Sequence, residues 1–128
     1  MAEIVLDASA ILTFLQGEKG AQTVEDVLPE AVVCSNNLAE IIAKLVDRGV
    51  PTDDINKIVA AFDFSVIDVS KEDAVANGLL RAGTREAGLS LGDRSCLALA
   101  QRLALPVLTT DRAWGRLADS KVEVRLLR

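Results

Sequence analysis

Histidine and tyrosine are absent from this 128-residue chain, and the absence of histidine limits the chemistry that it can perform. The chain has no imidazole for acid–base catalysis or for a Ser-His-Asp triad. The same absence removes histidine from the possible metal ligands. Any catalysis by this chain must therefore depend on carboxylates, hydroxyls, lysine, arginine or a bound ion.

Cysteine is scarce, and long apolar runs are missing. Cys34 and Cys96 lie in apolar contexts without the spacing of metal ligands, which predicts reduced, buried thiols in a cytoplasmic protein. No apolar run reaches the length of a membrane span. The N-terminal residues include acids and lack the basic segment of a signal peptide. We therefore expect a cytoplasmic protein with no membrane partner.

Basic residues are few in residues 1–80, where five Lys and Arg stand against fourteen Asp and Glu. Residues 81–128 reverse this balance, with nine basic residues against five acidic ones. The net charge of −5 therefore conceals a basic C-terminal part, which includes Arg81, Arg85, Arg112 and Arg116. A basic rim around an acidic centre would suit a phosphodiester substrate, although exposed arginines are also common on helix surfaces.

Strand and helix patterns alternate along the chain, which predicts an α/β domain with a mostly parallel sheet of roughly five strands. The length fits one domain over residues 1–128 with a sizeable core. The expected strands are 3–6, 31–34, 64–69, 107–109 and 122–126, and the expected helices are 8–16, 21–28, 38–48, 52–62, 71 to about 87, one that opens at Asp93, and 112 to about 119. Caps are expected from residues 35–37, Thr52 and Ser70.

Two acids follow directly after expected strands. Asp7 ends the first strand and Asp111 lies just past the fourth, so both should lie at the carboxyl edge of the sheet, where such folds bind ligands. Asp93 heads the apolar face of its helix, where either an N-terminal cap or a metal ion could compensate its charge. Glu40 lies opposite the apolar stripe of its own helix, so periodicity makes it solvated. Spacing alone therefore places two acids at this edge.

Four short motifs occur in order along the whole chain. They are Val5-Leu6-Asp7-Ala8-Ser9-Ala10, Asn37-Leu38-Ala39-Glu40, Leu91-Gly92-Asp93 followed by Cys96-Leu97-Ala98-Leu99-Ala100, and Leu108-Thr109-Thr110-Asp111-Arg112-Ala113-Trp114. Any one of them is weak evidence, but the four at these separations are specific. Together they resemble the PIN-domain family of metal-dependent ribonucleases, and within it the VapC toxins of bacterial toxin–antitoxin pairs.

The resemblance implies a PIN-like three-layer α/β/α fold that brings four acids together. They are Asp7, Glu40, Asp93 and Asp111, at the family's acidic metal-binding and catalytic positions, with nearby hydroxyls from Ser9 and from Thr109 or Thr110. Carboxylate oxygens suit Mg²⁺ or Mn²⁺, which could activate water for phosphodiester hydrolysis without histidine. The implied substrate is RNA, structured RNA such as tRNA in particular, with Arg81, Arg85, Arg112 and Arg116 as candidate phosphate contacts.

The family also implies a homodimer and a cognate antitoxin that covers the active site. Compatible apolar material is present, although ordinary core explains it equally well: Leu12, Phe14, Leu15, Ile41 and Leu45. Trp114 is expected to pack residues 112–119 against the sheet, with base stacking as the alternative role.

Three other classes of α/β protein are alternatives to a nuclease. A haloacid-dehalogenase-type phosphatase needs an acid two positions after Asp7, where Ser9 stands, and a receiver domain needs an acidic cluster after the first strand. Both motifs are missing. A non-catalytic protein-interaction module, with the acids as helix caps and surface charge, stays open and should bind no divalent metal.

Overall fold

The computed structural model describes residues 2–117 and 121–128 and contains one five-stranded sheet. The strand order is β3-β2-β1-β4-β5, and every neighbouring pair is parallel. The strands are β1 (Ile4–Leu6), β2 (Ala31–Cys34), β3 (Ser65–Ile67), β4 (Val107–Thr109) and β5 (Val124–Leu126). The predicted fold class is thereby confirmed, and the four-residue β2 and three-residue β4 have the expected bounds.

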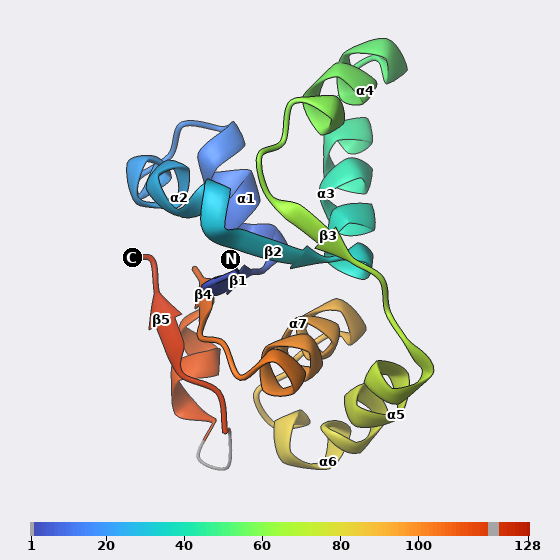
Figure 1. Cartoon of the computed structure of the whole chain (residues 1–128), viewed down its shortest axis with the longest axis vertical. Coiled ribbons are helices and arrows are strands. Elements are labelled where there is room, and N and C mark those ends of the chain that lie inside the picture. Colours follow the sequence, from blue (N-terminus) through green and yellow to red (C-terminus); the bar gives the residue numbers. More distant parts are fainter. Residues whose placement is uncertain (1, 118–120) are drawn as a thin grey trace.

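Helices cover both faces of the sheet, as Figure 1 shows. On one side lie α1 (Ala8–Leu15), α2 (Ala21–Val27), α3 (Ser35–Asp47) and α4 (Thr52–Ala60); on the other lie α5 (Lys71–Leu79), α6 (Arg81–Thr84) and α7 (Leu91–Leu103). Two 3₁₀ segments, η1 (Leu28–Glu30) and η2 (Arg112–Arg116), complete the described elements. The arrangement is the expected three-layer α/β/α fold.

Alternation along the central strands divides the core into two apolar clusters. Ile4 and Leu6 contribute to the cluster under α1–α4, whereas Val5 faces the cluster that contains Leu97 and Trp114. Successive side chains of a strand point to opposite faces, so a strand between two helical layers must be apolar throughout. Trp114 is 1% exposed within the second cluster, which confirms its packing role and leaves no ring face for base stacking.

The order of the strands reverses direction at β1. The chain moves from β1 to β2 and β3 on one side, then returns across the sheet to β4 and β5 on the other. In parallel sheets, the carboxyl ends of the two strands at such a reversal border a crevice that binds ligands. Asp7 follows β1 and Asp111 lies two residues past β4, so the crevice lies between these acids.

Several boundaries differ from the expectation. The helix expected over 71–87 is divided at Leu80 into α5 and α6, with Gly78 and Gly83 on either side of the division weakening the helix. Helix α7 begins at Leu91 rather than at Asp93, because Ser90 is its N-cap. After Asp111 a 3₁₀ segment replaces the expected helix, and that helix's expected end near residue 119 lies outside the described residues.

Two of the three expected caps are wrong. Helix α3 begins at Ser35 after Cys34, with no side-chain cap, and the Asn36 and Asn37 side chains contact α7 instead. Thr52 is the first residue of α4, after Pro51. Only the Ser70 cap is confirmed, in a capping box with Asp73.

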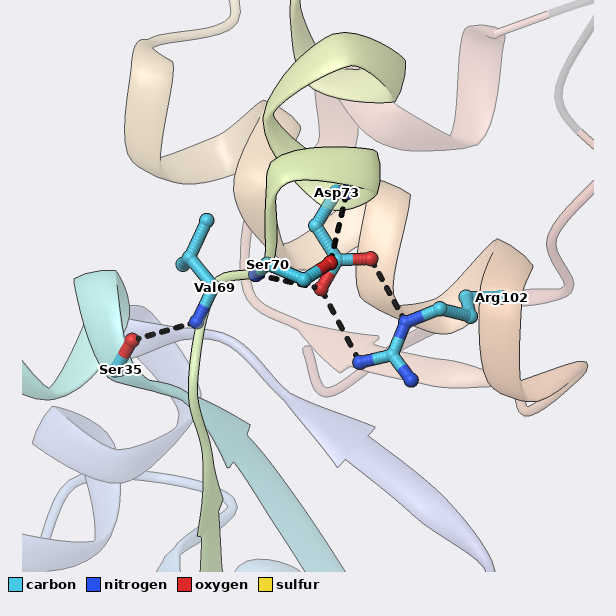
Figure 2. Close-up of polar contacts among 5 residues, drawn as sticks. All are labelled: Ser35, Val69, Ser70, Asp73 and Arg102. Carbon is cyan, nitrogen blue, oxygen red and sulfur yellow. Dashed lines mark hydrogen bonds and ion pairs between the residues drawn. The ribbon is translucent and has the colours of Figure 1, made fainter.

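Figure 2 shows the polar contacts that join α5 and the residues just before it to α3 and α7. The Ser35 hydroxyl of α3 accepts a hydrogen bond from the Val69 backbone nitrogen at 3.2 Å. The buried Asp73 carboxylate accepts from Arg102 of α7 at 2.7 and 3.1 Å. This guanidinium holds the pKa of Asp73 below its ordinary value. The contacts therefore fix α5 against the helix that carries Asp93.

The apolar residues considered for partner binding belong to the core or pack against it. Ile41 and Leu45 are buried, and Leu12, Phe14 and Leu15 are partly buried against the same cluster. Both cysteines are free and buried, as predicted. No helix in the described part of the chain is long and apolar enough to cross a bilayer.

Replacing Arg102 by alanine should lower the free energy of unfolding by about 2 kcal/mol, because Asp73 would stay buried without its charged partner. The partly exposed guanidinium keeps this cost below that of a fully buried pair. Urea unfolding at neutral pH measures the change, and Arg85→Ala, at an exposed position, serves as the control. Equal stabilities of the two variants would show that the pair does not hold α5 in place.

Candidate active site

Asp7 lies at the centre of the crevice and is 3% exposed. It is the N-cap of α1, and its Oδ1 accepts hydrogen bonds from the Ala10 backbone nitrogen at 2.9 Å and the Ser9 hydroxyl at 2.7 Å. Its Oδ2 accepts from the Thr109 hydroxyl at 2.5 Å. Both carboxylate oxygens are therefore held by neutral donors in a buried place.

Burial raises the pKa of Asp7 from its ordinary value near 3.8 to about 6. Hydrogen bonds from Ser9, Thr109 and Ala10 act in the opposite direction because they favour the charged form, and Asp93 adds a small repulsion. Desolvation is the largest of these effects, and the repulsion from Asp93 is the smallest. A cation beside this carboxylate would relieve both effects.

The hydroxyl partners of Asp7 join β1 to β4. Ser9 Oγ also accepts from the Thr110 backbone nitrogen at 3.0 Å, and Thr109 Oγ1 accepts from the Asp111 backbone nitrogen at 3.1 Å. Thr109 supplies the side-chain hydroxyl, whereas Thr110 takes part through its backbone. The alternative between the two threonines is thus decided for the contact with Asp7.

The Asp93 and Asp111 side chains both form capping hydrogen bonds at the start of a helix. The Asp93 carboxylate accepts from the Ser90 backbone nitrogen at 2.9 Å, and the Ser90 hydroxyl accepts from the Asp93 nitrogen at 3.1 Å, which forms a capping box. Asp111 Oδ1 accepts from the Ala113 nitrogen at 2.9 Å at the start of η2. Asp93 therefore supports the start of α7 as the third helical residue of a capping box, whereas the N-cap itself is Ser90.

Glu40 is partly buried, contrary to the solvated position that periodicity predicts. Its Oε1 accepts from the Asn37 amide nitrogen at 3.0 Å, and a Cβ added at Gly92 would overlap the Glu40 carboxylate. The first turn of α7 thus covers the face of α3 that the sequence alone leaves open. Burial raises the pKa of Glu40, and the nearby Asp93 adds to this effect.

All four predicted acids line one cavity of about 190 Å³, although they come from separate parts of the chain. Its described lining is Asp7, Ala8, Ser9, Leu12, Glu40, Lys44, Asp93 and Asp111. The four predicted arginines are not in this lining, and Lys44 is its only cation among the described residues. Lys44 was not among the predicted site residues. The sequence indicates it only through its position one turn after Glu40 on the same helix.

A larger cavity, of about 420 Å³, lies at the other end of α7. Among the described residues that line it, the one carboxylate is Glu123, which is paired with Arg125. Size alone therefore favours this place, but a single paired acid offers no site for a cation or for hydrolysis. Chemistry favours the smaller, four-acid cavity.

The donor set of the four-acid cavity matches a hard divalent cation. Oxygen ligands are those that Mg²⁺ and Mn²⁺ prefer, and no lysine or arginine forms an ion pair with these acids within the described residues. Across residues 2–117 and 121–128, no three acidic or thiol side chains already stand as a metal-ligand group. The acids therefore supply the oxygen ligands that a hard cation prefers and share one cavity, but they are not gathered into a ligand group, because Asp93 and Asp111 direct carboxylate oxygens toward helix starts.

Fold and cavity together define an acidic-site α/β protein, and comparison with known families identifies the class. The PIN domain profile matches residues 4–120. The chain belongs to the PIN domain family, as its four motifs indicated. Among curated proteins, none matches the chain.

Solved structures of toxin–antitoxin proteins share this fold. DNA-bound VapBC from Salmonella typhimurium aligns with a TM-score of 0.78 at 18% identity over 100% of both chains. A toxin–antitoxin complex from Klebsiella pneumoniae gives 0.76 at 20% identity over 98% of both. Mycobacterium tuberculosis VapC20, a sarcin–ricin loop cleaving toxin, gives 0.73 at 15% identity over 94% of this chain and 99% of its own. At these identities the likeness establishes the fold.

The raised pKa of Asp7 predicts a pH-dependent stability without metal. Because the pKa is higher in the folded state, ionising Asp7 disfavours folding, and stability should fall as pH rises from about 4 to about 7. A rise of about two pKa units corresponds to a loss of about 3 kcal/mol in the free energy of unfolding across this pH range. Asp7→Asn should not show this loss. Urea unfolding in EDTA across this range measures it. Parallel pH curves for the wild type, Asp7→Asn and the exposed control Asp53→Asn would contradict the assignment.

Proposed function

We propose that this protein is a metal-dependent endoribonuclease toxin that hydrolyses RNA phosphodiester bonds. The observation that carries the proposal is the convergence of Asp7, Glu40, Asp93 and Asp111 on one cavity at the reversal point of a parallel sheet. Helix capping explains three of these acids singly. Helix capping does not explain why Glu40 lines the same cavity, whereas a nuclease site built from four acids does explain it.

In this proposal, Asp7, Asp93 and Asp111 hold the cation. A bound Mg²⁺ or Mn²⁺ would polarise a phosphate oxygen and activate water. Glu40 helps hold it or orients the attacking water. Its Oε1 is held by Asn37, whereas its Oε2 has no hydrogen bond within the described residues, so Oε2 is the atom available to accept a proton. Burial raises the pKa of Glu40, and a raised pKa makes a carboxylate a stronger base.

Cations near the cavity are the proposed contacts for RNA phosphates. Lys44 lines the cavity, and Arg112 follows Asp111 directly. Arg116 lies on η2, Arg81 lies on α6, and Arg85 follows α6 directly. Phosphate contacts position a nucleic acid without reading its sequence, so these residues do not define which RNA is cut. Structured RNA such as tRNA remains the proposed substrate class.

The proposed partners are a cognate antitoxin and a second copy of the chain. Support for the antitoxin comes from the structural neighbours, which include a toxin–antitoxin complex and a DNA-bound VapBC pair. The proposal places the protein in the cytoplasm, where the two buried free thiols would stay reduced.

Calorimetric titration of Mn²⁺ separates a metal ligand from a helix cap. Asp93→Asn should weaken Mn²⁺ binding at least about 10-fold, since it removes a charged ligand. Ser90→Ala breaks the same capping box but keeps the carboxylate, so it should cost about 1 kcal/mol of stability and leave Mn²⁺ affinity within about twofold. If the wild type binds no Mn²⁺, or both variants bind equally, Asp93 is a cap, and the interaction-module alternative gains support.

Cleavage of a structured RNA tests the activity itself. Asp7→Asn should reduce the cleavage rate at least about 100-fold, beyond the loss typical of an outer-shell group, and EDTA should abolish cleavage by the wild type. Asp53→Asn should cleave at the wild-type rate, because its side chain is exposed on α4. Gel analysis of end-labelled tRNA provides the measurement. Cleavage that persists in Asp7→Asn would reject this site.

A further inference from the structure

Asn37 connects the two helices that carry Glu40 and Asp93. It lies on α3, one turn before Glu40, and is 1% exposed. Its amide nitrogen donates to Glu40 Oε1 at 3.0 Å and to the Gly92 carbonyl oxygen of α7 at 3.0 Å. One buried amide group therefore contacts a site carboxylate and the backbone beside the next site carboxylate.

The orientation of the Asn37 amide follows from its partners. Both partners are acceptors, so the nitrogen must face them. The amide oxygen is then buried without a hydrogen-bond partner within the described residues. An unpaired buried oxygen is unfavourable for folding, so an apolar residue would serve packing better. Packing alone therefore does not account for an asparagine at this position.

Gly92 lies against the same carboxylate group of Glu40 that Asn37 contacts. A Cβ at position 92 would overlap the Glu40 carboxylate, so that carboxylate rests against the bare first turn of α7. Gly92 directly precedes Asp93 in that turn. The Glu40 carboxylate thus contacts both the Asn37 amide and the turn of backbone that carries Asp93.

We propose that Asn37, together with Gly92, is a positioning residue of the four-acid cavity. It fixes the Glu40 carboxylate relative to Asp93 and so sets the spacing of two acids on different helices. The consequence for metal binding rests on the function proposed above, whereas the placement of Glu40 does not. Outer-shell partners of this kind typically change metal affinity 10- to 100-fold when removed.

The neighbouring Asn36 provides a matched control. Its amide nitrogen donates to the Ser95 hydroxyl of α7 at 3.0 Å, so it also joins α3 to α7. No hydrogen bond connects Asn36 to Glu40 within the described residues. Asn36→Ala and Asn37→Ala therefore each remove asparagine contacts between the same helices, but only the second releases a site acid.

The test compares Mn²⁺ affinities by calorimetry, with thermal unfolding in EDTA as the check on folding. Asn37→Ala should bind Mn²⁺ about 10-fold more weakly than the wild type, and Asn36→Ala within about twofold. Gly92→Ala should also weaken binding. Equal losses in both asparagine variants would overturn the proposal in favour of general helix packing. Wild-type affinity in Asn37→Ala would overturn it as well.

A metal-free measurement distinguishes this proposal from the proposed function. In the wild type, NMR should show the Asn37 side-chain amide protons protected from solvent exchange, and Glu40→Ala should shift and expose them. Asn36 amide protons should not respond to Glu40→Ala. If the wild type binds no Mn²⁺ but these responses occur, the nuclease function fails and the positioning of Glu40 stands. If the Asn37 protons ignore Glu40→Ala, the positioning proposal fails.

Discussion

The burial of one carboxylate, that of Asp7, determines much of the structure around it. A charge this far from solvent needs donors, and the chain supplies them from α1 and β4. The Ser9 and Thr109 hydroxyls that donate to Asp7 also accept backbone hydrogen bonds from the segment after β4. The cost of burying the charge is therefore offset by contacts that also join the carboxyl ends of β1 and β4 beside the acidic cavity.

Much of the fold could be predicted, because it follows from local patterns. Apolar runs gave the buried strands, and strand–helix alternation gave the parallel sheet, so Asp7 and Asp111 could be placed at its carboxyl edge. The edge near Asp93 could also have been predicted. A helix that leads directly into a parallel strand must run antiparallel to it, so α7 had to begin at the carboxyl edge, as it does.

The remaining features of the site depend on contacts between two helices, which the periodicity of one helix cannot predict. Periodicity places Glu40 opposite its own apolar stripe, and only the packing of α7, permitted by Gly92, turns that side into the cavity wall. Asn37 is predicted as a cap because asparagine often caps helices, yet its amide nitrogen donates to the backbone of the neighbouring helix α7. Resemblance to a family supplied Glu40 where physical reasoning from the sequence did not.

Asp7, Asp93 and Asp111 each support the first turn of a helix as well as lining the cavity. For Asp93 and Asp111, selection for a folded chain and selection for the cavity therefore act on the same side chains. A mutated gene that loses either of these two carboxylates would encode a chain that is both altered in its cavity and less stable. Cellular proteases remove less stable chains faster, so chains altered at these positions would not accumulate.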